Sequence, residues 1–182
     1  STTKNKVLKK FLVFLKKNEK KILRQNKKDI KFAKKKKLKT NLIDRLMLTS
    51  KKLESIKKSV KDIIKLRDPV DKILDNWKRP NGLNIKKVST PIGVIAVIYE
   101  SRPNVTSDIS SLCFKSGNAV ILRGGSEAIN TNKILSSLFR KALTINNVNP
   151  DFVQFINDRN RKVVDFLLSK MTKEIDVIIP RG

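Results

Sequence analysis

Residues 91–127 read PIGVIAVIYESRPNVTSDISSLCFKSGNAVILRGGSE, and this stretch decides the fold of the chain. Residues 94–99 form an uninterrupted apolar run, which is typical of a strand covered on both faces within a parallel sheet. Polar residues and a proline at 100–104 end the run, so we expect the chain to turn at the carboxyl end of the strand. Open α/β sheets bind their ligands at that edge. The stretch therefore predicts a parallel sheet with a ligand site.

A helix is predicted between this strand and the next, over residues 106–115. Apolar residues recur there at helical spacing. Ser107 or Asp108 can cap its start, and Gly117 with Asn118 can close its end in the left-handed conformation. The predicted unit is a strand, a loop and a helix that leads back to the sheet.

The same alternation continues to the end of the chain. A second short strand is followed by the glycine pair of RGGSE, residues 123–127, which opens a further helix. The remaining predicted elements are strands at 119–122 and 153–156, helices at 128–143 and 162–171, and a buried strand at 177–179. Strands that alternate with helices indicate an α/β fold with a Rossmann-like parallel sheet.

The first 90 residues are predicted to be mainly helical. Apolar residues recur there at helical spacing with lysines on the opposite faces, Ser50 is a possible N-cap of the third helix, and Asp68-Pro69 ends that helix. Residues 82–89 alternate apolar and polar side chains, which predicts a strand. We therefore divide the chain into a helical region at 1–81, a strand at 82–90 and a Rossmann-like segment at 91–182.

The formal net charge is +26, from 42 Lys and Arg against 16 Asp and Glu. So basic a chain raises the alternative of a helical module that binds nucleic acid. However, arginine is scarce among the basic residues, and one Trp and one Tyr offer little surface for stacking bases. Lys, Asn and Ile have adenine- and thymine-rich codons, so a biased genome composition also accounts for the lysines. We favour a solvated lysine face over a nucleic-acid site.

Several motifs resemble those of one enzyme family. YESRPNVT at 99–106 and LCFKSGNAVILRGGSEA at 112–128 are similar to γ-glutamyl phosphate reductase, also called glutamate-5-semialdehyde dehydrogenase, of the aldehyde dehydrogenase superfamily. LIDRL at 42–46 and DVIIPRG at 176–182 resemble further parts of this family. The resemblance covers essentially the whole chain, and it implies the cofactor-binding part of an aldehyde dehydrogenase fold.

The resemblance also implies a function. The family reduces L-glutamyl 5-phosphate to L-glutamate 5-semialdehyde and phosphate with NADPH, a step of proline biosynthesis. It further implies a cytoplasmic enzyme, a homo-oligomer in which the strand at 82–90 pairs subunits, and a functional link to glutamate 5-kinase. No apolar run approaches the roughly 18 residues that a membrane-spanning helix needs, so we expect no membrane partner.

Candidate site residues lie just beyond the predicted strands. The amide of Asn104 can donate to a developing oxyanion, although it can equally shape a turn. Arg102 can grip a phosphate or carboxylate with its fork of donors, or it can be a surface or helix-capping residue. The resemblance places NADP(H) against Glu100, Ser101, Arg123, Gly124, Gly125, Ser126, Glu127, Pro180, Arg181 and Gly182. In this set Arg123 would meet the adenosine 2′-phosphate and Glu127 the ribose.

Cys113, the only cysteine, is expected in the core and not in catalysis. It lies on the apolar face of the predicted helix, and the chain has no histidine to activate it. Without histidine or paired cysteines we expect no metal site.

The catalytic cysteine of the family falls beyond Gly182, so we interpret the chain as a fragment that is inactive alone and binds NADP weakly. An inactive, truncated paralogue that pairs with a full-length subunit is a further alternative.

Overall fold

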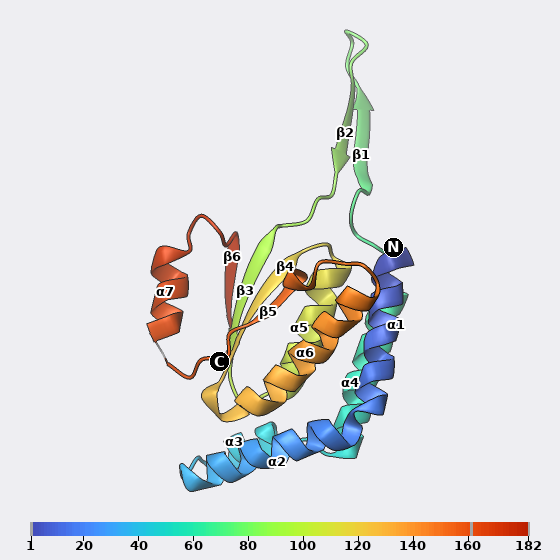
Figure 1. Ribbon diagram of the computed structural model, residues 1–182. Helices are drawn as coiled ribbons and strands as arrows, with labels where there is room; N and C mark the ends of the chain where they lie inside the picture. The colour runs from blue at the N-terminus through green and yellow to red at the C-terminus, as the bar shows by residue number, and fades with distance from the viewer. Residues whose placement is uncertain (1, 161, 182) are drawn as a thin grey trace.

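The computed structural model describes residues 2–160 and 162–181 (Figure 1). The helices α1 (Thr2–Lys17), α2 (Glu19–Lys35), α3 (Thr40–Leu46) and α4 (Ser50–Lys65) come first. They are followed by a hairpin of β1 (Ile73–Lys78) and β2 (Asn84–Val88). The later elements are β3 (Val94–Tyr99), α5 (Pro103–Lys115), β4 (Ala119–Gly124), the 3₁₀ helix η1 (Ser126–Ala128), α6 (Ile129–Ile145), the 3₁₀ helix η2 (Pro150–Phe152), β5 (Val153–Phe155), α7 (Lys162–Lys170) and β6 (Val177–Arg181).

One sheet contains β5, β4, β3 and β6 in that order, and each neighbouring pair is parallel. Helices α5 and α6 cover one face of the sheet, whereas α7 lies on the other (Figure 1). This arrangement confirms the predicted α/β fold with a Rossmann-like parallel sheet. Because the strands are parallel, their carboxyl ends meet at one edge, and that edge faces α2 and α3 (Figure 1). We call it the carboxyl edge.

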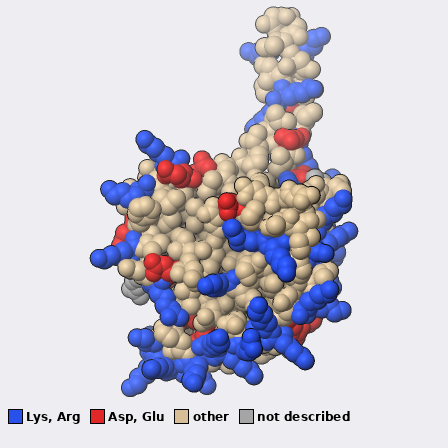
Figure 2. Space-filling model, in the orientation of Figure 1, with Lys and Arg blue, Asp and Glu red and all other residues tan. Residues whose placement is uncertain are grey.

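Basic side chains are spread unevenly over the molecule. In the face shown in Figure 2, Lys and Arg gather over α2 and α3, while the body near the sheet shows fewer of them. The lysines at 34–37 lie at the end of α2 and in the turn that follows, where they are exposed. They therefore occupy a solvated helix end.

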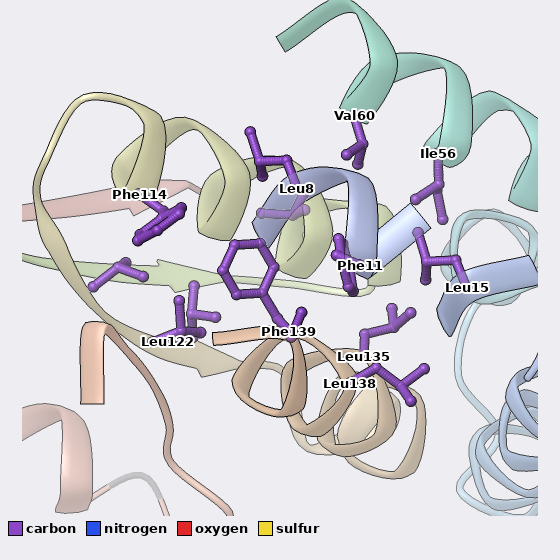
Figure 3. Packing of buried hydrophobic residues seen from close by; sticks show 14 of the residues in the cluster. Leu8, Phe11, Leu15, Ile56, Val60, Phe114, Leu122, Leu135, Leu138 and Phe139 are labelled. Carbon is purple, nitrogen blue, oxygen red and sulfur yellow. The ribbon is translucent and has the colours of Figure 1, made fainter. Parts of the chain in front are cut away.

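The amino-terminal helices share a core with the sheet (Figure 3). The ring of Phe11 on α1 lies 4.8 Å from that of Phe139 on α6, and Phe114 on α5 lies 5.9 Å from Phe139. Leu8 and Leu15 of α1 are fully buried in the same cluster. Each such side chain stabilises the fold by about 1.5–3 kcal/mol relative to exposure. The helices and the sheet are thus one hydrophobic unit.

Two buried polar residues of α2 fix its position. Asn26 accepts a hydrogen bond at 2.8 Å from the backbone N–H of Leu48, which precedes α4. The carboxylate of Asp29 accepts from the backbone N–H groups of Asn130 at 3.1 Å and Thr131 at 2.7 Å, in the first turn of α6. It also accepts from the side chains of both residues. Since a helix amino terminus favours negative charge, Asp29 holds α2 against the start of α6.

Several local predictions need correction. Helix α5 begins at Pro103 and not at residue 106, because proline suits the first helical turn, where its missing N–H is not needed. The N-cap of α4 is Thr49, whose side chain accepts from the N–H of Lys52, and Ser50 is already helical. Gly117 has φ +79 and ends α5 as predicted.

Two predictions about strands also differ from the structure. Strand β1 lies inside the range 1–81 that we assigned to helices, because the alternating β2 needs a partner and finds it across a tight turn. Strand β6 is an edge strand and is not buried, since Val177 is 36% exposed and Ile179 is 44% exposed. A sequence run of apolar residues does not reveal which side of a strand lacks a neighbour.

Candidate ligand site at the carboxyl edge

Two adjoining hollows lie at the carboxyl edge. The first has a volume of about 450 Å³ and lies between α4 and the start of α5; its lining residues are Arg45, Leu48, Lys52, Ser55, Ile56, Ser59, Arg102, Asn104 and Asp108. The second, of about 200 Å³, lies against the end of β3 and is lined by Leu42, Arg45, Tyr99, Glu100, Ser101, Arg102, Val105 and Arg181. Both contain Arg45 and Arg102, so we treat them together as the carboxyl-edge groove.

The carboxyl-edge groove is rich in positive charge. It is lined by the cations Arg45, Lys52, Arg102 and Arg181, against the carboxylates Glu100 and Asp108. Within the described residues, neither Arg45 nor Arg102 has a carboxylate oxygen within 4.0 Å. Unpaired guanidinium groups bind phosphate or carboxylate through two parallel hydrogen bonds. The groove is therefore suited to an anionic ligand.

Arg102 lies where the chain leaves β3 and enters α5. It occupies the N-cap position of α5, but its side chain makes no capping hydrogen bond, and the residue is exposed. The structure thus agrees with the surface alternative for this residue, and only a capping bond from the side chain is missing. The guanidinium is instead available to the groove.

Asn104 lies in the first turn of α5 and lines the groove. It is not a turn residue, so that alternative is wrong. Its amide Nδ2 donates at 3.1 Å to Oδ2 of Asp108, one helical turn further on. One of its two N–H groups is thus directed along the helix, and the other remains for a ligand.

Ser101 and Glu127 connect the loops that follow β3 and β4. The N–H and the hydroxyl of Ser101 both donate to Oε1 of Glu127, each at 2.7 Å. Ser101 is buried and has φ +22, a conformation that a non-glycine residue adopts at a cost. Glu127 thus holds the backbone after β3 in place, and only its Oε2 is left for a ribose hydroxyl.

The glycine pair after β4 accommodates neighbouring side chains of the same protein. A Cβ on Gly124 would lie 2.2 Å from Nδ2 of Asn132, and one on Gly125 would lie 2.0 Å from Oε1 of Glu127. Gly125 has φ −58, so the space and not the backbone angle requires glycine there. Ser126 begins η1 directly afterwards. The packing of the protein's own side chains therefore already requires glycine at both positions.

Arg123, at the end of β4, is 8% exposed. Its Nη1 donates to the carbonyl of Gly124 at 2.9 Å, and its Nη2 lies 3.5 Å from the carbonyl of Asn160. Its Nε is buried and lacks a hydrogen-bond partner among the residues that the structure describes. A buried guanidinium with only carbonyl partners keeps an uncompensated positive charge, which an anion would neutralise.

The remaining predicted cofactor residues lie along β3 and β6. Pro180 and Arg181 pair with Ile98 and Tyr99 at the end of the sheet, and Arg181 and Glu100 line the groove. Proline is acceptable in β6 because this is an edge strand. Gly182, the last residue assigned to the cofactor, lies outside the described residues.

Arg45 and Lys52 are groove residues that we did not predict. They come from α3 and α4, which lie far from the β3 loop in sequence. The Nζ of Lys52 donates at 2.7 Å to the carbonyls of Asp44 and Met47, which fixes it at the rim. Two signals were available: Arg45 is an arginine in a region where nearly every cation is a lysine, and it lies in LIDRL, one of the motifs of the family resemblance.

Cys113 lies in the core, as predicted. It is 7% exposed, and burial raises the pKa of its thiol to about 11. A thiol that is almost wholly protonated at neutral pH is a poor nucleophile.

Residues 2–160 and 162–181 contain no cluster of three or more His, Cys, Asp or Glu side chains placed to hold a metal ion. None of their helices combines the length and the apolar character needed to cross a bilayer.

Comparison with known proteins shows which enzymes the chain resembles. No family model matches the chain. A γ-glutamyl phosphate reductase from Thermoanaerobacter sp. is 49% identical over 180 residues, which cover 99% of this chain and 43% of the relative. The crystal structure of γ-glutamyl phosphate reductase from Thermotoga maritima superposes with a TM-score of 0.94 at 40% identity, over 100% of this chain and 44% of that one.

More distant structures share the fold alone. A propionaldehyde dehydrogenase from Rhodopseudomonas palustris and an engineered glycolyl-CoA reductase solved with bound NADP⁺ both have a TM-score of 0.67 at 13% identity. They cover 100% of this chain and 38% and 37% of their own lengths. The chain thus spans less than half of the proteins that it resembles. The close matches nevertheless extend over nearly all of its residues, so the chain is similar along its length to a part of the γ-glutamyl phosphate reductases.

Proposed function

We propose that these residues form the cofactor-binding and substrate-orienting part of an enzyme that reduces L-glutamyl 5-phosphate to L-glutamate 5-semialdehyde. The carbon–oxygen bond to phosphate breaks, phosphate leaves with the electron pair, and the acyl carbon gains a hydride. The observation that carries the proposal is the carboxyl-edge groove, in which Arg45 and Arg102 present unpaired guanidinium groups beside the end of β3. Its larger hollow, about 450 Å³, is of the size that small-molecule sites have.

NADP(H) is the cofactor that we propose, and the residues at the end of β4 and directly after it fit its anionic end. Arg123 combines a buried, unpartnered Nε with a charge that no described carboxylate neutralises. An adenosine 2′-phosphate would supply both a hydrogen-bond acceptor and a negative charge there. Glu127 is turned toward Ser101, so it does not oppose such a phosphate. Bound NADPH would supply the hydride.

The groove residues would orient the substrate and stabilise charge. Arg102 and Arg45 would bind its anionic groups, and the free N–H of Asn104 would donate to the acyl oxygen as negative charge develops on it. Since Cys113 is buried and protonated, the attacking thiolate would come from outside residues 1–182. These 182 residues alone are therefore expected to lack reductase activity.

We further propose that the β1–β2 hairpin pairs copies of the protein. It projects from the body of the molecule (Figure 1), and Ile73, Trp77 and Leu83 are 57%, 41% and 56% exposed. A two-stranded hairpin is marginally stable alone, and exposed apolar side chains on it favour an interface. A cytoplasmic location and a functional link to glutamate 5-kinase stay predictions of the family resemblance.

A chimaera tests the main proposal. The aligned segment of the Thermotoga maritima reductase is replaced by these 182 residues, and phosphate-dependent reduction of NADP⁺ is followed with L-glutamate 5-semialdehyde as substrate. We expect activity that requires phosphate and the aldehyde. A folded chimaera, by circular dichroism and thermal unfolding, that is inactive while the parent enzyme is active would contradict the proposal.

The nucleic-acid alternative has one observation in its favour, the concentration of Lys and Arg over α2 and α3 (Figure 2). Binding through lysines alone would be weak in sequence preference and would fall steeply with salt. Fluorescence anisotropy with DNA duplexes of two unrelated sequences, at low and at physiological salt, distinguishes a nucleic-acid module from non-specific binding through lysines. Discrimination between the sequences at physiological salt would favour a nucleic-acid module.

A further inference from the structure

We propose that Asp108 binds the α-ammonium group of the substrate, and so makes the site selective for an amino acid over the matching acid without an amino group. The inference rests on the proposed function, because it concerns the substrate of the same groove. It adds a recognition residue that neither the sequence motifs nor the family resemblance identified.

The carboxylate of Asp108 is held firmly on the wall of the groove. Oδ1 accepts from the hydroxyl of Ser59 on α4 at 2.9 Å, and Oδ2 accepts from Nδ2 of Asn104 at 3.1 Å. The two bonds come from different helices, so they fix both the position and the plane of the carboxylate. A carboxylate held in this way is prepared to meet a ligand at little entropic cost.

Neither of the groups that hold Asp108 is charged. Among the residues that the structure describes, no Lys or Arg nitrogen lies within 4.0 Å of its carboxylate, although Arg45, Lys52 and Arg102 line the same hollow. The negative charge of Asp108 is therefore free to pair with a cation from a ligand. Each carboxylate oxygen has a second lone-pair position for that purpose.

The charges of the larger hollow together match a zwitterion with an anionic tail. Asp108 and Asn104 lie on α5, whereas Arg45 and Lys52 lie on the opposite wall formed by α3 and α4. Arg102 lies at the junction with the smaller hollow at the end of β3. An amino acid can thus place its ammonium on Asp108 and its anionic groups on the arginines.

Calorimetric titration of the 182-residue chain with two stable probes tests this assignment. L-2-Amino-5-phosphonopentanoate carries an ammonium, a carboxylate and a phosphonate, and 5-phosphonopentanoate lacks only the ammonium. We expect the amino compound to bind at least about tenfold more tightly, the ratio given by one charge-assisted hydrogen bond. In Asp108→Asn this ratio should fall to about one, and the affinity for 5-phosphonopentanoate should be unchanged or higher.

Two variants separate the charge of Asp108 from its structural role. Ser59→Ala removes one hydrogen bond between α4 and α5 but keeps the carboxylate, so it should retain most of the selectivity. Asp62→Asn makes the same chemical change at an exposed position of α4, outside the groove, and should retain all of it. Equal binding of the two probes, binding of neither, or an unchanged ratio in Asp108→Asn would each overturn the inference. The chimaera assay stays independent of these results, so the loss of one proposal is distinguishable from the loss of the other.

Discussion

One oxygen of the Glu127 carboxylate accepts both the backbone N–H and the hydroxyl of Ser101, each at 2.7 Å. The two residues lie after adjacent parallel strands, so this pair of hydrogen bonds joins the loops on which the candidate site depends. Gly125 makes the pair possible, because a Cβ there would lie 2.0 Å from the same oxygen. Glu127 therefore positions the β3 loop, in addition to any contact with a cofactor.

This geometry predicts that Gly125→Ala and Glu127→Ala are not additive. Glu127→Ala leaves the Ser101 donors unpaired and should lower the free energy of unfolding by about 1–3 kcal/mol. Gly125→Ala should be similarly destabilising in the wild-type chain, because it displaces the Glu127 carboxylate. In the Glu127→Ala background it should be neutral, or stabilising by up to about 1 kcal/mol, since its φ of −58 suits alanine. Urea unfolding of the wild type, the two single variants and the double variant measures these free energies. Additive effects of the two substitutions would contradict the account.

Asp29 predicts a second, purely structural effect. Replacing it with Asn removes the charge at the start of α6 and one of the two oxygens that accept hydrogen bonds there. We expect the free energy of unfolding to fall by about 1–3 kcal/mol. Asp44→Asn, on the exposed side of α3, is the matched control and should change it by less than about 0.5 kcal/mol. Equal stabilities of the two variants in urea unfolding would show that the contact between α2 and α6 does not depend on Asp29.

Cys113 predicts a distinct pH dependence of thiol chemistry. With a pKa raised to about 11 by burial, roughly one thiol in a thousand is ionised at pH 8. The rate of alkylation by iodoacetamide should therefore be far below that of glutathione at pH 8, and it should keep rising through pH 10. In urea the two rates should become similar. Fast alkylation of the folded chain that levels off near pH 8 would mean that the thiol is exposed and not in the core.

The β1–β2 hairpin predicts an effect on assembly. Trp77→Lys places a charge among the exposed apolar side chains of the hairpin and should shift the chain toward the monomer. Lys86→Gln, on the facing strand, is the control and should leave the assembly unchanged. Light scattering coupled to size exclusion reports the mass. A wild-type chain that is monomeric at all concentrations tested would remove the hairpin as an interface of these 182 residues.

The sequence predicted the sheet well because β3 is a short apolar run, β4 begins with four apolar residues, and a glycine-ended helix lies between them. It failed where neighbours decide the outcome. The apolar pattern of β6 could not show that one side of the strand is open, and β1 could not be recognised before its pairing with β2 was known.

The candidate site was predicted only in part, for the same reason. Arg102 follows β3 and Arg123 lies at the end of β4, so their place at the carboxyl edge could be foreseen. The contributions of Arg45 and Asp108 depend on how α3, α4 and α5 pack together. The bond from Asn104 to Asp108 likewise follows from the early start of α5 at Pro103, which the loop-like sequence Arg-Pro-Asn concealed.

The central claim is that the carboxyl-edge groove binds the substrate of the reductase, and Arg102 tests it most directly. In the chimaera, Arg102→Gln should lower kcat/KM for L-glutamate 5-semialdehyde by about 10- to 1000-fold, because a guanidinium partner of an anionic group is lost. Arg67→Gln, at an arginine outside the groove, should leave kcat/KM within about twofold of the value for the unsubstituted chimaera. If kcat/KM of Arg102→Gln equals that of Arg67→Gln, the groove is not the substrate site.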